Sequence, residues 1–181
     1  MKKHDFGAWF LLCGLLFLFT PGVSATAEET EPLFAFAAQE EEVRPGGSFA
    51  VTCTPARGDI GAFVLFADFD AEVIANAKAE LPESVKSRHV YTSQQDGRFA
   101  LVYTAKDGGV LTEPFTLVFR TERGAEFDAM TVSFSVTDAA NAVGHELIDT
   151  VQTTEKTFTY VQEPEIGAAL LSLIPPTGTL S

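Results

Sequence analysis

Short segments rich in Phe, Val and Thr recur from Leu33 onward, and turn signals separate many of them. The segments cover 33–38, 48–54, 60–69, 88–92, 98–104, 115–121, 129–137 and 157–162. Residues that tolerate positive φ or preset a turn lie between them, as in Pro45-Gly46-Gly47 and Asp96-Gly97. This spacing predicts an all-β protein, either a sandwich or a barrel.

Alternation within a segment indicates which side chains are buried. Phe49, Val51 and Cys53 alternate with smaller or polar residues, and 129–137 alternates in the same way. We expect one face of each of these strands to be buried and the other to meet water. On this basis Cys53 is predicted to be an inert core thiol rather than a nucleophile.

The segment 60–69 is apolar on both of its sides. Phe63, Leu65, Ala67 and Phe69 share one parity, and Ala62, Val64 and Phe66 share the other. Such a strand is either covered on both faces or presents an apolar outer face. Two interpretations stay open here: a loop or terminus of the chain covers that face, or it is a docking surface for another protein.

Residues 73–81 form the one ambiguous stretch. Their Ala, Glu and Lys content favours a helix or helical turn over a strand.

The termini differ in character from the body of the chain. Lys2 and Lys3 give a positive start, the apolar run 8–19 follows, and Val23-Ser24-Ala25 ends in small residues of the kind that signal peptidase accepts. We therefore predict a signal peptide at 1–25, an acidic leader at 26–32, a sandwich at 33–162 and a tail at 163–181. Export through this signal predicts a secreted or cell-surface location, with no membrane span after cleavage.

The tail contains Ile174-Pro175-Pro176-Thr177-Gly178, which resembles the Leu-Pro-x-Thr-Gly signal of sortase substrates. Coincidence and a truncated sorting signal are both compatible with this pattern.

Charge and length narrow the functional classes. The chain has 181 residues, enough for one ordinary domain, and its 12 Lys and Arg against 25 Asp and Glu give a net charge of −13. That charge argues against nucleic acid as a partner. Loss of the signal peptide would leave Cys53 as the lone cysteine and no Trp.

The patterns that would indicate catalysis are incomplete in this sequence. His145 to Asp149 begins like a zinc-protease helix, but Asp149 stands where the second His is needed. Asp68 and Asp70 could form a carboxylate pair, although Asp70 after a strand is more typical of a turn cap. The sequence predicts no enzyme, no metal site and no cofactor.

The order of the segments resembles that of the cohesin domain, the receptor module that holds dockerin-bearing enzymes in cellulosomes. The matching stretches cover about 130 residues and include 43–51, 60–74, 97–103, 111–120 and 129–144. Departures are Gly47 where Asp is usual, Ala71 where Pro is usual and Asn76 where Val is expected. Ala62 and Val64 also stand where members often carry Asn or Asp.

The resemblance implies a nine-stranded jelly-roll-like β-sandwich of cohesin type that binds a helical partner across one sheet. The expected partner is a dockerin-bearing or other exported protein. Strand parity adds the predicted contact residues: Val64 and Phe66 at the centre, with Asp68 and Arg98 at a polar rim. The alternative is a carbohydrate-binding or adhesive module, with polysaccharide as the ligand in the first case; the absence of Trp outside the signal favours protein binding.

Overall fold

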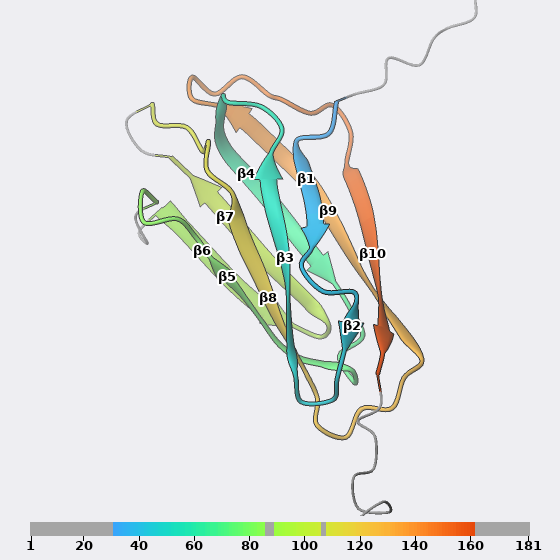
Figure 1. Ribbon diagram of the computed structural model, residues 1–181. Coiled ribbons are helices and arrows are strands. Elements are labelled where there is room, and N and C mark those ends of the chain that lie inside the picture. Colours follow the sequence, from blue (N-terminus) through green and yellow to red (C-terminus); the bar gives the residue numbers. More distant parts are fainter. Residues whose placement is uncertain (1–30, 86–88, 106–107, 162–181) are drawn as a thin grey trace, which may run out of the picture. The chain divides into compact units, whose positions relative to one another are not determined.

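The computed structural model describes residues 31–85, 89–105 and 108–161, which form ten strands in two sheets (Figure 1). The four-stranded sheet has the order β1-β3-β8-β5 and the six-stranded sheet the order β2-β10-β9-β4-β7-β6. The first contains β1 (Phe34–Ala38), β3 (Ser48–Pro55), β8 (Phe115–Thr121) and β5 (Ile74–Glu80). The second contains β2 (Glu42–Val43), β10 (Gln152–Tyr160), β9 (Ala129–Asn141), β4 (Ile60–Asp68), β7 (Arg98–Thr104) and β6 (Val90–Gln95). The predicted all-β sandwich is confirmed.

Phenylalanine rings from the two sheets pack against one another in the core. Phe34 of β1 meets Phe63 of β4 with ring centroids 4.9 Å apart, in an edge-to-face arrangement. Phe49 of β3 meets Phe158 of β10 at 4.3 Å. These rings are buried, and each comes from the inward parity of its strand. Aromatic contacts across the layers therefore fix the face of each sheet that turns inward.

The helical expectation for 73–81 is wrong, because Ile74–Glu80 form the edge strand β5. This strand pairs antiparallel with β8, and Ala77 lies opposite Phe119. Ile74 and Ala77 are buried, while a register shift between Ile74 and Asn76 breaks the simple alternation. Pairing with a distant strand has overridden the local helix preference of Ala, Glu and Lys.

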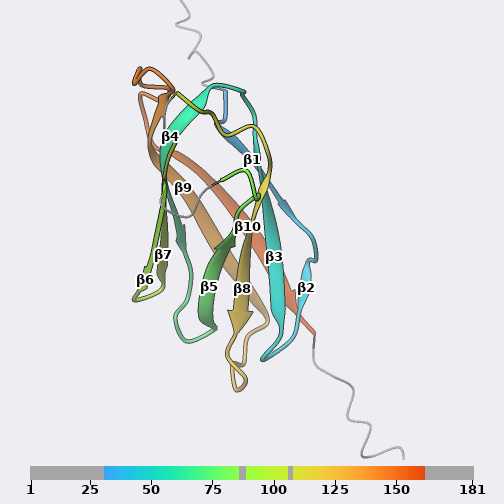
Figure 2. The same cartoon turned by 90° about the vertical axis from the view of Figure 1, so that its left-hand side faces the viewer.

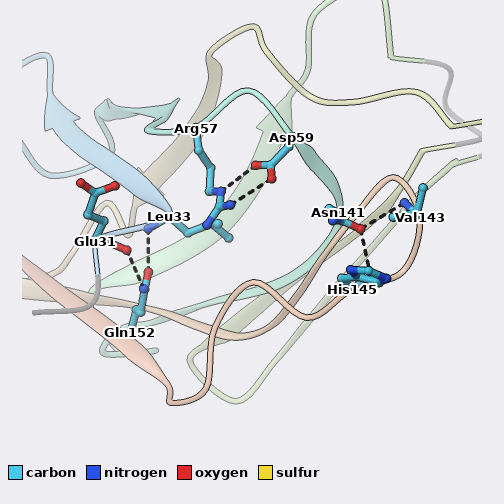
Figure 3. Close-up of polar contacts among 8 residues, drawn as sticks. All are labelled: Glu31, Leu33, Arg57, Asp59, Asn141, Val143, His145 and Gln152. Atoms are coloured by element: carbon cyan, nitrogen blue, oxygen red, sulfur yellow. Dashed lines mark hydrogen bonds and ion pairs between the residues drawn. The ribbon is translucent and has the colours of Figure 1, made fainter. Parts of the chain in front are cut away.

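Two glutamine side chains link the sheets at opposite edges of the sandwich. Gln152 of β10 accepts a hydrogen bond from the Leu33 amide at 2.7 Å and donates to the Glu31 carbonyl at 3.0 Å (Figure 3). Gln94 of β6 likewise accepts from the Ala77 amide at 2.8 Å and donates to the Ala75 carbonyl at 3.2 Å. Each carboxamide thus satisfies a backbone donor and acceptor two residues apart, as a neighbouring strand would.

Several predictions fall outside the described residues: the signal peptide at 1–25, most of the leader at 26–32, and the tail at 163–181. In the described part of the chain, no helix has the length and apolar character needed to cross a membrane.

Candidate functional site

Strand β4 has one buried face and one half-buried face. Phe63 and Leu65 are buried between the sheets, whereas Val64 and Phe66 point to the outer face of the six-stranded sheet and keep part of their surface in water. The inner and outer residues predicted from the alternation in the sequence are therefore the inner and outer residues of the strand. Because the neighbouring residues alternate between the two faces, a single strand supplies both core and surface apolar groups.

On the β7 side, small or apolar side chains lie beside the outer residues of β4. Phe66 lies opposite Ala100 of β7 and Ser135 of β9, while Val64 lies opposite Val102 of β7 and the charged Asp138 of β9. Tyr91 of β6 lies next to Val102 in register and is 65% exposed. Side chains directly opposite one another on one face are close enough to touch. The result is a continuous apolar strip across β4, β7 and β6.

A charged pair borders this strip. The Arg98 guanidinium donates to both Asp68 carboxylate oxygens, with Nε–Oδ1 at 2.5 Å and Nη2–Oδ2 at 3.1 Å. The same guanidinium lies 5.1 Å from the centre of the Phe66 ring, within range of a cation–π contact. The hydrogen bonds from its guanidinium to the Asp68 carboxylate raise the pKa of Arg98. Together these residues line a shallow hollow of about 420 Å³.

The β6–β7 turn holds Arg98 in place. Asp96 and Gly97 both have positive φ, 47° and 77°, as a two-residue hairpin requires. The Gly97 carbonyl accepts a hydrogen bond from the Phe69 amide at 2.7 Å, which ties the turn to the end of β4. A Cβ at position 97 would collide with the Phe69 carbonyl oxygen, so glycine is required there. Arg98, next in the chain, is thereby set directly opposite Asp68.

The structure brings the four predicted contact residues, Val64, Phe66, Asp68 and Arg98, together on one outer face. Their role in binding remains a prediction. Sequence reasoning missed Val102 and Tyr91 as members of the same strip. Val102 could have been found from the sequence, because both faces of β7 are apolar. The inner face contains Phe99, Leu101 and Tyr103, and the outer face contains Ala100 and Val102.

The remaining candidates for chemistry have structural roles. The Asp70 carboxylate accepts from the Glu72 amide at 2.8 Å, which makes it the predicted turn cap. Burial raises the pKa of the Cys53 thiol far above its usual range, consistent with the inert core position expected. His145 lies in a loop, not on a helix, and its amide donates to the Asn141 side chain at 2.9 Å (Figure 3). The described residues contain no group of three metal-ligating side chains placed to hold an ion.

No family model and no curated protein sequence matches this chain. Solved structures do match. A type I cohesin in complex with a dockerin, from Clostridium thermocellum, superposes with a TM-score of 0.59 at 14% identity, over 72% of this chain and 100% of the other. The protein has a cohesin-like fold.

Two further cohesins support the same assignment. The sixth cohesin of scaffoldin B from Acetivibrio cellulolyticus, in complex with a dockerin, gives a TM-score of 0.52 at 13% identity, over 68% of this chain and 97% of the other. A non-cellulosomal cohesin from Archaeoglobus fulgidus gives 0.51 at 13% identity, over 74% and 95%. The cohesin-like fold predicted from the order of segments is thus confirmed, and at these identities the comparison shows the fold alone.

Proposed function

We propose that this protein is a secreted, non-catalytic docking module that binds a dockerin-bearing or other exported protein. The partner would lie on the outer face of the six-stranded sheet, which we call the docking face and define by Val64, Phe66, Asp68, Arg98 and Val102. The observation that carries the proposal is Phe66, a large apolar side chain left half-buried on the outer face and flanked by a charged pair.

The mechanism follows from the chemistry of this face. Val64, Phe66 and Val102 supply apolar area that loses water when a flat partner surface covers it. The Asp68–Arg98 pair adds fixed hydrogen-bonding groups at the rim, and these orient the partner more than they add to affinity. Because the strands are already fixed in a sheet, their backbone loses little conformational entropy when a partner binds. Support also comes from cohesins of the same fold that were solved in complex with dockerins.

The test is a binding measurement between the full chain and a panel of dockerin modules, with a matched pair of variants. Phe66→Asp places a charge at the centre of the docking face and should weaken binding by about 30-fold or more. Val118→Asp is the control, because Val118 is also half-buried at mid-strand but on the outer face of the four-stranded sheet. It should leave binding unchanged.

Thermal melting separates binding from folding. Both variants should melt close to the parent protein, since neither side chain is buried in the core. Equal affinity of Phe66→Asp and the parent for a bound dockerin would contradict the proposal. A second result would also contradict it: the parent binds insoluble polysaccharide and Phe66→Asp does not. The same face would then bind sugar.

A further inference from the structure

Strand β6 leaves a row of backbone groups open at the edge of the six-stranded sheet. Its neighbour β7 bonds to β4 through odd-numbered residues, as shown by the Phe69 amide on the Gly97 carbonyl and the Ala105 amide on the Gly61 carbonyl. The register of the β6–β7 hairpin pairs Gln95 with Arg98 around a two-residue turn. In such a hairpin the closing pair is hydrogen-bonded, so Tyr91, Ser93 and Gln95 bond to β7.

It follows that the backbone amides and carbonyls of Val90, Thr92 and Gln94 point away from β7. No residue in the described ranges forms a hydrogen bond with these groups. Figure 2 shows β6 at the margin of the sandwich, beyond β7. Five of the six β6 residues are exposed, and the strand contains neither a charge nor a proline. It therefore lacks the usual features that block strand addition.

The other sheet edges are protected in ways that β6 is not. On β5, the Gln94 side chain occupies the Ala77 amide and the Ala75 carbonyl. Strand β2 is only two residues long. Strand β1 is open, but pairing two copies antiparallel about Phe36 would place Glu31 of one copy opposite Glu41 of the other. Like charges at that seam oppose such pairing.

We propose that β6 pairs antiparallel with β6 of a second copy of this chain. The open groups are symmetric about Thr92, so a two-fold axis there pairs Thr92 with Thr92, and Val90 with Gln94 in both directions. Every other antiparallel register leaves some of these groups unpaired. Two-fold symmetric pairing of one patch with itself is the commonest form of homodimer.

Side chains and charge agree with this register. Tyr91, which is 65% exposed, lies opposite Ser93 of the other copy, so its ring gains cover without a clash. Asp96 is the carboxylate next to β6, and the two Asp96 residues lie at opposite ends of the seam, eight positions or about 27 Å apart. This separation exceeds the screening length in physiological salt, so the two Asp96 carboxylates repel each other little across the seam.

The dimer would join two six-stranded sheets into one continuous sheet. A two-fold axis between antiparallel strands is perpendicular to the sheet, so both docking faces would lie on the same side. A partner carrying two binding segments could then engage both copies. The pairing itself does not depend on what the docking face binds.

The experiment measures the mass of the full chain by sedimentation from about 5 to about 500 μM, and we expect a monomer–dimer equilibrium that shifts with concentration. Thr92→Pro removes the amide at the two-fold axis without removing a bond to β7, and should weaken dimerisation at least tenfold. Thr92→Lys, which places two charges face to face, is a second variant with the same expected result. Thr153→Lys adds that charge on β10, away from the seam, and should dimerise like the parent.

Amide hydrogen exchange locates the contact. Exchange at Val90, Thr92 and Gln94 should slow as concentration rises, whereas Tyr91, Ser93 and Gln95 should be protected at every concentration. A monomer throughout the range would overturn the proposal. So would a dimer that both Thr92 variants leave intact, or one that forms without slowing exchange at Thr92.

Discussion

The two faces of β4 are built from similar residues yet have different surroundings. Phe63, Leu65 and Ala67 face the other sheet and are at most 2% exposed. Val64 and Phe66 face outward and are half-buried. An apolar side chain on the inner face is enclosed by rings of both sheets, as when Phe63 meets Phe34 and Phe115 of the four-stranded sheet and Tyr103 of its own sheet. On the outer face, within the described ranges, Val64 and Phe66 lie beside residues of their own sheet and keep part of their surface in water.

This contrast shows that the hydrophobicity of a strand face does not by itself decide whether that face belongs to the core or to the surface. Both faces of β4 contribute apolar area, but only the inner face is needed to hold the sheets together. The outer apolar strip is not needed for that purpose, and a contiguous apolar surface is typical of interaction sites. We propose that a partner covers this strip for part of the time.

The largest expected difference between the two faces comes from removing adjacent side chains. Leu65→Ala should lower the free energy of unfolding by about 2–5 kcal/mol, because it leaves a cavity in the core. Val64→Ala should lower it by about 1 kcal/mol or less, because Val64 is half-buried and water can fill the space. Urea denaturation of both variants measures the difference. Equal losses would mean that Val64 is packed like a core residue.

Adding volume tests the same contrast from the other direction. Ala67→Leu inserts methyl groups beside Phe99 and Phe134 in a closed core and should cost about 1–3 kcal/mol. Ala100→Leu adds the same group on the outer face, opposite Phe66, and should change stability by no more than about 0.5 kcal/mol. Urea denaturation of both variants measures the difference, provided that their m-values equal that of the parent, so that a shift in midpoint reports a change in stability. A large loss in Ala100→Leu would show that the outer face is closed.

The sequence was most informative where alternation was strong. Parity in 60–69 separated the inner set from the outer set correctly, since a strand places successive side chains on opposite faces whatever it pairs with. The same argument placed Cys53 in the core. Arg98 was also predicted correctly to lie on the outer face, because the turn residues Asp96 and Gly97 fix where β7 begins.

The sequence was least informative where a strand depends on a distant neighbour. The residues of β5 favour a helix locally, and only pairing with β8 makes them a strand. Strand β6 continues through polar residues to Gln95 and β10 begins at Gln152, each beyond the range that apolar alternation predicted. Tyr91 joins the outer apolar strip through the register of β6 on β7, which no local pattern encodes.

The smallest expected effect concerns the charged pair at the rim of the outer face. Arg98 and Asp68 are joined by two hydrogen bonds, but both side chains contact solvent, so water and salt screen their attraction. Arg98→Ala should therefore change the melting temperature by no more than about 3 °C, and raising NaCl from about 0.05 to about 0.5 M should reduce that change. Arg98→Lys is the matched control, since it keeps the charge but loses the planar fork over Phe66. A drop of about 10 °C in Arg98→Ala would mean that the guanidinium clamps β7 to β4, and the rim would then belong to the fold rather than to recognition.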